Sequence, residues 1–423
     1  MAKSALALDA NTAAQIESMF RNYSQVNAPG GSVMVIHQGK AVFTKGFGLA
    51  DLERKVHCTT NTNFRLASVT KQFTAMAVLM LVERRQLTLD ERLTDFFPEF
   101  PAYGKEVTVR HLLTHTSGLP DYEVLIPPGT TIPVLDQDVL RLLVAADMRR
   151  RTEATHGDDR LLTSAAAYFA PGTQYRYSNS GYALLALIVE VRSGQTFAWF
   201  LRENIFEPLK MSNTLAYEEG YAVIPNRAYG HTPKRDSLSP SDGGERVRER
   251  IRRKDDSRFE PPNSEHLLSR PSATLSSIPN GGEGRGEEAL GFMGRGVPFE
   301  RTDQSLTSSV LGDGGIYSSV TDLFKWDQAL YKSKLVSEST LRVAFSPATP
   351  TDKPGRSYGF GWYLSEYRGL KAIWHSGETI GFRTRIVRFP EKKFTVIILA
   401  NRADAKLEEL PDQIADLVLF KDR

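Results

Sequence analysis

One segment constrains the fold of this chain more than any other: residues 68–85, SVTKQFTAMAVLMLVERR, are apolar on nearly every side of a helix. The segment makes about five turns and ends in basic residues, as the C-terminus of a helix favours. A helix that is apolar all round has to be buried on all sides. The chain has 423 residues, 41% of them hydrophobic, which suffices for a large core of two or three structural units. We therefore expect residues 68–85 to form the central core helix.

Strand patterns lie toward both ends of the chain. Residues 12–23 predict a helix, and GSVMVIHQGKAVFTKGFGLAD after it predicts two strands joined by a turn at Gln38 and Gly39. The C-terminal third contains four further strand segments, YGFGWYLSE, LKAIWHSG, FRTRIVRF and KFTVIILAN, with a turn at Pro390 between the last two. Helical patterns occupy the middle. We expect an α+β fold, in which both sets of strands form one antiparallel sheet flanked by helices, with a mainly helical subdomain inserted between them.

The same patterns predict the organisation of the chain. Residues 1–66 and 308–423 should form the sheet subdomain, and residues 67–233 the helical one. Residues 234–305 are dense in Arg, Ser, Pro, Gly and Glu, which predicts a flexible charged insertion or surface lid. Its basic run ERVRERIRRKDD (245–256) has the composition of a site for an acidic partner, but the interleaved acidic residues favour a solvated charged loop.

Composition excludes several classes of protein. Lys and Arg number 53 against 50 Asp and Glu, and the resulting net charge of +3 argues against a nucleic-acid-binding protein as a whole. The single cysteine, Cys58, rules out an internal disulfide framework. No window approaches the roughly 18 apolar residues of a membrane span, and the apolar stretch before Asp9 is too short for a signal peptide. We expect a cytoplasmic protein, or a periplasmic or secreted one if a leader has been removed.

The start of the central helix contains a possible nucleophile and base. Ser68 and Lys71 are spaced i and i+3, which places both side chains on one face of a helix. At a helix N-terminus, free backbone N–H groups and the positive dipole end would stabilise an oxyanion on an acylated serine. A lysine in apolar surroundings has a lowered pKa and can act as a base. On these residues alone, a serine N-cap followed by an exposed lysine is the commoner explanation.

A second group of polar residues lies just before a predicted buried helix, in PGTQYRYSNSGYALL. Tyr177 and Asn179 are two positions apart, so in an extended segment their side chains point to the same side. A phenol near a cation can shuttle a proton, and a carboxamide can orient a substrate amide. A turn with an asparagine cap is the alternative explanation.

Two further patterns involve histidine. WHSGE (residues 374–378) ends a predicted strand, where Gly377 allows the backbone to approach a ligand closely and His375 titrates near neutral pH. His111 and His115 have the i, i+4 spacing of zinc ligands, but no glutamate follows the first histidine as in zinc peptidases. Packing and loop hydrogen bonding are favoured for this second pair, and no metal or other cofactor is expected.

Together and in this order, the three motifs resemble those of the serine β-lactamase and penicillin-binding-protein superfamily, and most closely its class C β-lactamase-related serine hydrolases. VTVRHLLTHTSGL, YSNSGYALL, IFEPLKMSNT and GDGGIYSSVTDLFKW also look like blocks of this family. The resemblance covers most of the chain apart from residues 234–305. It implies a serine hydrolase that forms an acyl-enzyme on small esters, amides or short peptides of D-amino acids, without a cofactor.

The resemblance also implies a role for each motif residue. Ser68 would be the acylated nucleophile and Lys71 its hydrogen-bonded base. Tyr177 would shuttle protons and serve deacylation. Asn179 would contact the amide or ester of the substrate.

The third motif implies the rest of the site. His375 stands where many members have the lysine of a Lys-Thr-Gly triad, with Ser376 and Gly377 following. The backbone N–H groups of Ser68 and Glu378 would form the oxyanion hole. Because histidine replaces a permanent cation, β-lactams are expected to be weak or incidental substrates.

A non-catalytic binding or assembly module with the same fold is the alternative function, with the basic run of the insertion recruiting a partner. The complete set of reactive residue types argues against it, since a binding module has no chemical reason to keep them. We expect a small molecule or short peptide as the substrate, and no nucleic-acid partner.

Overall fold

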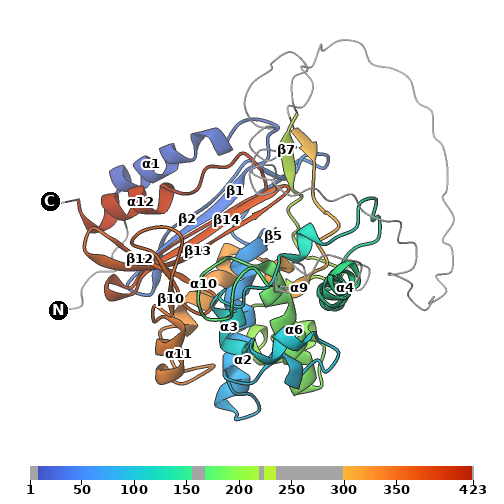
Figure 1. The fold of residues 1–423 in the computed structure, drawn as a ribbon. Helices are drawn as coiled ribbons and strands as arrows, with labels where there is room; N and C mark the ends of the chain where they lie inside the picture. The colour runs from blue at the N-terminus through green and yellow to red at the C-terminus, as the bar shows by residue number, and fades with distance from the viewer. Residues whose placement is uncertain (1–7, 155–166, 219–222, 235–298, 422–423) are drawn as a thin grey trace, which may run out of the picture. The chain divides into compact units, whose positions relative to one another are not determined.

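The computed structural model describes residues 8–154, 167–218, 223–234 and 299–421. An eight-stranded antiparallel sheet with the strand order β10-β11-β12-β13-β14-β15-β1-β2 forms the centre of this part of the chain (Figure 1). Its strands are β1 (Gly31–His37), β2 (Lys40–Phe47), β10 (Thr349–Pro350), β11 (Ser357–Tyr358), β12 (Tyr363–Tyr367), β13 (Leu370–Thr379), β14 (Phe382–Phe389) and β15 (Phe394–Ala400).

The two ends of the chain meet inside this sheet. β1 lies between β2 and β15, so that Val35 pairs with Phe43 on one side and with Val396 on the other. Asn401, which follows β15, stabilises the pairing of β1 with β15, because its Oδ1 accepts a hydrogen bond from the Gly30 N–H at 2.9 Å. The prediction of one antiparallel sheet built from both sets of strands, and of an α+β fold, is confirmed.

The central strands β1 and β15 are buried on both faces, so most of their residues are apolar despite the two-residue alternation of side chains. Val33 and Val35 of β1 pack in an outer core with α1 (Ala10–Met19) and α12 (Leu410–Leu419). Met34 and Ile36 point to the inner core, which the sheet shares with the helical layer. Figure 1 shows α1 and α12 on one face of the sheet and the remaining long helices on the other.

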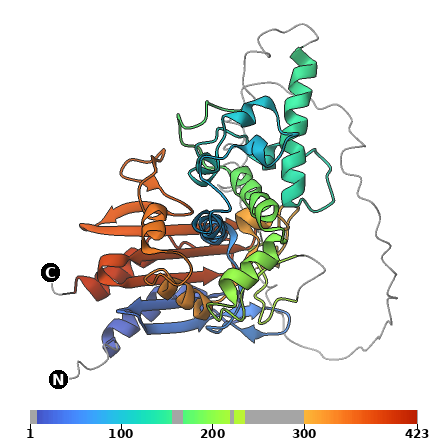
Figure 2. The same cartoon turned by 90° about the horizontal axis from the view of Figure 1, so that it is seen from below.

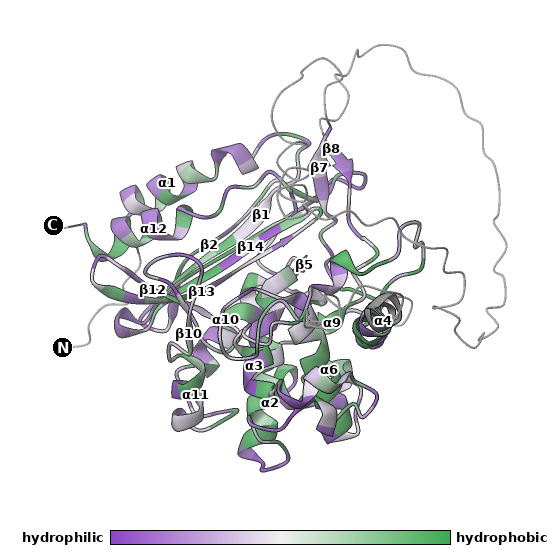
Figure 3. Ribbon diagram, viewed as in Figure 1, coloured by the Kyte–Doolittle hydropathy of each residue, from purple (hydrophilic) through white to green (hydrophobic). Residues whose placement is uncertain are grey.

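The predicted central helix is present and buried. α2 spans Lys71–Glu83, and all residues from Lys71 to Leu81 are buried. A 3-10 turn, η2 (Ala67–Thr70), precedes it, so Ser68 lies in this tight turn and not in regular α-helix. α2 packs against α6 (Asn179–Ser193), which ends at Gly194 in the left-handed conformation with φ 69°. Figure 3 shows the predominantly apolar colour of both helices.

Most of the other helices lie on the inner face of the sheet, and Figure 2 shows them gathered on one side of the strands. These are η3 (Leu93–Asp95), η4 (Ala102–Lys105), α3 (Val109–Leu113), η5 (Tyr122–Val124), α4 (Asp136–Ala154), α7 (Phe197–Leu201), the π-helix η6 (Arg202–Phe206), α9 (Leu311–Gly314), α10 (Val320–Ala329) and α11 (Glu338–Ala344). By contrast, η1 (Arg21–Tyr23) contributes Tyr23 to the outer core, and η7 (Pro390–Lys392) is the turn between β14 and β15. Within the described ranges, no single helix could cross a bilayer. α6 and residues Phe197–Phe206 reach the required length and composition only as a pair bent by 79°.

Two elements differ from the sequence predictions. The segment YGFGWYLSE forms two strands, β11 and β12, because Gly361 adopts φ 77° and reverses the chain between them. A side chain at Gly361 would also lie 2.7 Å from the Lys71 carbonyl oxygen. α4 was not predicted, although Val139, Leu140 and Leu143 supply the i, i+1, i+4 apolar face that buries it.

Short strands complete the described chain: β3 (Leu49–Asp51) with β4 (Val56–His57), β5 (Phe64–Arg65) and β6 (Leu215–Ala216) on either side of β9 (Ile316–Ser318), and β7 (His231–Pro233) with β8 (Phe299–Arg301). β7 and β8 pair antiparallel, with Thr232 opposite Glu300. Most of the predicted insertion, including its basic run 245–256, lies outside the described residues, and its boundaries stay predictions.

Candidate active site

Tertiary contacts fix the turn that carries Ser68. The Leu66 N–H donates to the Ile316 carbonyl at 2.8 Å, and the Leu66 carbonyl accepts from the Thr384 hydroxyl at 2.7 Å. Ala67 follows with φ 48°, a left-handed conformation that is unusual for a residue other than glycine. Such strain persists only where the surroundings impose it. Ser68 comes directly after this bend, and it is partly exposed.

Lys71 is fully buried beside Ser68, with 0% of its surface exposed. Its ammonium donates to Ser68 Oγ at 3.1 Å, to Asn179 Oδ1 at 2.9 Å and to the Asp313 carbonyl at 3.0 Å. These three acceptors use all three N–H bonds of the charged form. The exposed-lysine explanation of the Ser-x-x-Lys spacing is therefore wrong, and the predicted serine–lysine hydrogen bond is present.

Burial lowers the pKa of Lys71 from 10.5 to about 8. The carboxylates of Asp313, Asp121 and Glu123 act in the opposite direction and favour the charged form. A lysine with this pKa is partly neutral at slightly alkaline pH, when its nitrogen can accept the proton of Ser68.

Asp313, which sequence reasoning missed, helps to hold Lys71. It belongs to the short helix α9, and its carboxylate accepts from the Tyr122 hydroxyl at 3.2 Å. Burial raises the pKa of Asp313 to about 6, with Lys71 acting in the opposite direction. The Asp136 carboxylate accepts from the backbone N–H groups of Leu311 and Gly312, at 2.8 and 3.0 Å, and so fixes the start of α9. A backbone carbonyl that contacts a lysine leaves no motif in the sequence.

Tyr177 lies over the same lysine. The Lys71 nitrogen is 4.9 Å from the centre of the Tyr177 ring. The Tyr177 hydroxyl is buried, and the Ser68 hydroxyl is its polar neighbour. Burial and the nearby Tyr363 raise the pKa of Tyr177 well above 10, and the Ser68 hydroxyl opposes this rise. The phenol therefore stays protonated, and its hydroxyl is available to a substrate.

Asn179 lies at the start of α6 and contacts the lysine directly. Its backbone N–H donates to the Asp121 carboxylate at 3.1 Å. Its side-chain oxygen accepts from Lys71, so its amide N–H₂ group is the part that remains for a substrate. The predicted contact between Asn179 and substrate stays a prediction.

His375 is brought to the site by β13, but it is buried, with 1% of its surface exposed. Its Nδ1 lies 2.7 Å from the Ser376 carbonyl, which can only accept, so Nδ1 carries the proton. Nε2 then accepts from the Tyr358 hydroxyl at 3.1 Å. Burial and Lys71 lower the pKa of His375 to about 3. His375 is consequently a neutral imidazole at pH 7, with both nitrogens engaged.

The residues after His375 contribute mainly through their backbone. A side chain at Gly377 would come within 2.1 Å of the Leu66 carbonyl, so glycine lets β13 approach the turn that carries Ser68. Ser376 and Glu378 alternate to the opposite face of the strand from His375. Glu378 is exposed. Their side chains point away from the site, and the oxyanion hole predicted for the backbone N–H groups stays a prediction.

Aromatic rings line the site, and only one of them, Tyr177, was predicted. Tyr358 lies 4.8 Å from Tyr363 and 4.6 Å from His115, measured between ring centres. His115 Nδ1 accepts from the Ser178 N–H at 3.2 Å, whereas His111 caps α3 by accepting from the Thr108 N–H. The two histidines thus serve packing and local hydrogen bonding, as the sequence analysis favoured.

The fold and the buried serine–lysine pair define the class of this protein. A model of the Beta-lactamase family matches residues 16–419, and the chain belongs to this family. The predicted resemblance is confirmed. The family assignment supports a serine hydrolase as the general class of activity.

Three comparisons illustrate the range of the family. The chain is 27% identical to a penicillin-binding protein of Bacillus subtilis (strain 168), covering 97% of this chain and 76% of the relative. It is 25% identical to a D-aminopeptidase of Brucella canis, covering 93% of this chain but only 60% of that protein. The solved D-amino acid amidase of Ochrobactrum anthropi SV3, in complex with L-phenylalanine, superposes with a TM-score of 0.67 at 21% identity, covering 98% of this chain and 99% of the amidase. This last likeness concerns the fold alone.

Proposed function

We propose that this protein is a serine hydrolase that forms an acyl-enzyme on Ser68 and acts on small esters, amides or short peptides. The observation that carries the proposal is the 3.1 Å hydrogen bond between the buried Lys71 nitrogen and Ser68 Oγ. A serine hydroxyl becomes a useful nucleophile only beside a base, and Lys71 is a base with a lowered pKa at hydrogen-bond distance.

The reaction proceeds in two halves. Ser68 Oγ attacks the substrate carbonyl carbon while neutral Lys71 takes the hydroxyl proton, and backbone N–H groups at Ser68 and Glu378 stabilise the oxyanion. Tyr177 passes a proton to the leaving amine or alcohol and regains it from Lys71. A water molecule then attacks the acyl-enzyme, giving its proton to the same Tyr177–Lys71 pair, and the acid product leaves as Ser68 Oγ is reprotonated.

The charges around Lys71 favour substrates without a carboxylate near the scissile bond. His375 is neutral, because burial lowers its pKa to about 3. The nearby carboxylates of Asp121 and Asp313 disfavour anions further. Amides, esters and peptides of D-amino acids suit such a site, and the name of the D-aminopeptidase relative agrees with this choice. β-Lactams, whose carboxylate has no permanent cation to meet, are proposed as weak substrates.

The test compares the wild type with Ser68→Ala in hydrolysis of p-nitrophenyl butyrate, with Ser339→Ala in the exposed part of α11 as the matched control. We expect turnover by the wild type and the control, loss in Ser68→Ala, and a mass increase of one butyryl group on Ser68 after rapid quenching. D- and L-phenylalanine amides and a chromogenic β-lactam then rank the substrate classes. Full activity of Ser68→Ala would disprove the proposal.

A further inference from the structure

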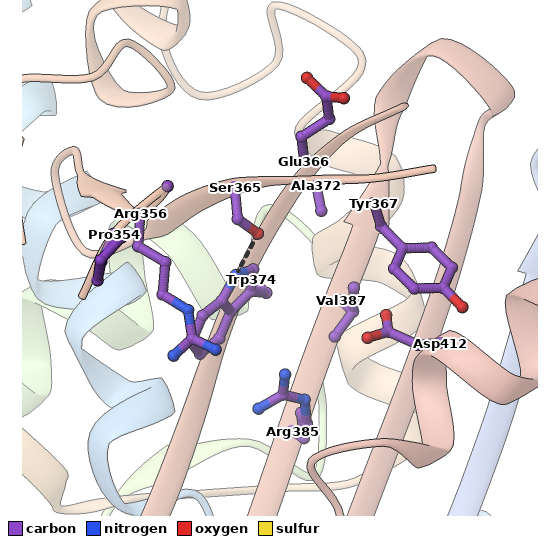
Figure 4. A pocket seen from close by; sticks show the side chains of 11 residues that line it. Pro354, Arg356, Ser365, Glu366, Tyr367, Ala372, Trp374, Arg385, Val387 and Asp412 are labelled. Carbon is purple, nitrogen blue, oxygen red and sulfur yellow. Dashed lines mark hydrogen bonds between the residues drawn. The ribbon is translucent and has the colours of Figure 1, made fainter. Parts of the chain in front are cut away.

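A cavity of about 330 Å³ lies on the opposite face of β13 from His375. Trp374, the residue before His375, lies at its floor and is 7% exposed. Its indole N–H donates to Ser365 Oγ at 3.0 Å, the dashed bond of Figure 4, which fixes the orientation of the ring. β12, β14, the start of α12 and the loop before β11 that carries Arg356 supply the other walls, so the cavity is separate from the serine–lysine site.

Two guanidinium groups face this one indole. The central carbon of Arg385 is 4.6 Å from the Trp374 ring centre, and that of Arg356 is 5.3 Å away. Arg385 Nε is buried and has no hydrogen-bond partner in the described part of the chain. Burial lowers the pKa of Arg385; the carboxylates of Asp412 and Glu408 oppose this shift, and the charge of Arg356 adds to it. Arg356 and Arg385 thus place two positive charges beside one ring, and the Nε–H group of Arg385 is an unused donor. Both features favour the binding of an anion.

A separate negative charge lies across the cavity. Asp412, in the first turn of α12, is half-buried, and Figure 4 shows its carboxylate on the other side of Val387 from Arg356. Burial raises the pKa of Asp412, and the charges of Arg385 and Arg356 oppose this rise. Glu366, the other acid of the cavity wall, is exposed, and Figure 4 shows it pointing away from both arginines. The cavity therefore carries charges of both signs: two guanidinium groups beside Trp374, and the Asp412 carboxylate beyond Val387.

We propose that this cavity binds a small zwitterion of the amino-acid type. Its carboxylate would lie between Arg356 and Arg385 and use the free Nε donor. Its ammonium group would pair with Asp412, and its side chain would pack on Trp374 and Val387. Bidentate pairing of guanidinium with carboxylate supplies the geometry for the first contact. This site is independent of the proposed hydrolase activity.

Calorimetric titration of the 423-residue chain tests the site, in the Ser68→Ala background so that no ligand is turned over. The ligands are D- and L-phenylalanine, N-acetylphenylalanine, phenylalanine amide and inorganic phosphate. We expect one phenylalanine enantiomer or both to bind with a dissociation constant below about 1 mM. N-acetylphenylalanine and phosphate lack the ammonium group, and phenylalanine amide lacks the carboxylate. Each of the three should bind about tenfold more weakly than phenylalanine.

Variants locate the binding. Arg385→Gln and Asp412→Asn should each weaken phenylalanine binding about tenfold, whereas Arg342→Gln on the exposed face of α11 should not change it. Arg356→Gln, at an exposed position, replaces Arg385→Gln if the latter does not fold. The proposal would be overturned if phenylalanine did not bind, or if the acetylated compound or phosphate bound as tightly as phenylalanine. Unchanged phenylalanine affinity in the arginine variants would also overturn it.

Discussion

Lys71 combines two properties that rarely occur together in one lysine, complete burial and three satisfied hydrogen bonds. Replacing it tests the base directly. Lys71→Met keeps the apolar stem but cannot accept a proton, so kcat/KM for p-nitrophenyl butyrate should fall about 10²- to 10⁴-fold. The substitution also leaves Asn179 Oδ1 and the Asp313 carbonyl without their donor, so the free energy of unfolding should fall by about 1–3 kcal/mol. Lys40→Met, at an exposed position of β2, is the control, and equal activity of both variants would exclude Lys71 as the base.

The pH dependence follows from the same residue. Since only neutral lysine accepts a proton, kcat/KM should rise with pH and level off above about pH 8, the lowered pKa of Lys71. Asp313→Asn removes a carboxylate that raises this pKa, so the midpoint should move to lower pH. A pH–rate profile from about pH 6 to about pH 10 measures both midpoints. An unchanged or higher midpoint in the variant would contradict this account of the electrostatics.

At the scale of single residues, the sequence predicts the groups for which we propose chemical roles, and the structure brings them together, but the sequence does not predict the residues that hold them. Ser68, Lys71 and Tyr177 could be predicted because their side chains form spaced motifs. Tyr358 and Asp313 could not, since Tyr358 acts by a hydrogen bond to His375 and Asp313 by its backbone carbonyl. Both contacts exist only after distant segments have packed. The neutral state of His375 also depends on burial, which the sequence does not specify.

Among the elements, β13 and the turn before Ser68 make the closest approach, and Gly377 is the residue that permits it. Gly377→Ala would place a carbon 2.1 Å from the Leu66 carbonyl and 2.3 Å from Thr384 Oγ1. Displacement of β13 should lower the free energy of unfolding by about 1–3 kcal/mol and remove most of the hydrolytic activity.

Gly314→Ala is the matched control for this substitution. An added carbon at Gly314 meets Ala67 at an ordinary 3.6 Å, so this variant should keep both stability and activity. Urea unfolding and ester hydrolysis compare the two variants. If Gly377→Ala behaved like the control, close packing would not be the reason for glycine there.

The short helix α9 depends on a single carboxylate. Asp136→Ala leaves the N–H groups of Leu311 and Gly312 without their acceptor, and each buried orphan donor should cost about 1–3 kcal/mol. Because α9 carries the carbonyl that contacts Lys71, ester hydrolysis should fall as well. Asp352→Ala, at an exposed position, provides the control in urea unfolding. Stability equal to that of the control would show that α9 holds its position without Asp136.

Long apolar elements could be predicted from the sequence, whereas turns and amphipathic elements have weaker patterns and could not be placed as well. α2, α6 and the strands β13 to β15 have strong periodic patterns, and the structure contains all of them. The first turn of the central helix became 3-10 because tertiary contacts force the bend at Ala67. α4 mixes its apolar positions with many charges, so its pattern is weaker.

For the whole molecule, the pairing of β7 with β8 places Pro233 opposite Phe299, although 65 residues, 234–298, separate them in the sequence. A loop of about four residues joining Lys234 to Phe299 should therefore close the pair without strain. We expect this shortened protein to keep its unfolding temperature and its hydrolysis of p-nitrophenyl butyrate. A protein that no longer folds would show that residues 235–298 contribute to the stability of the remaining chain.

The meeting of the two ends of the chain in one sheet has a consequence for biosynthesis. Gly30 and Asn401, which hydrogen-bond across the junction of β1 and β15, are 371 positions apart. On the ribosome, β1 cannot pair with β15 until almost the entire chain has been synthesised. Until then, the backbone N–H and C=O groups along one edge of β1 are unpaired. Non-local pairing of this kind is slow and leaves nascent chains open to aggregation. Release from the ribosome, and chaperone protection until then, should therefore control the yield of folded protein.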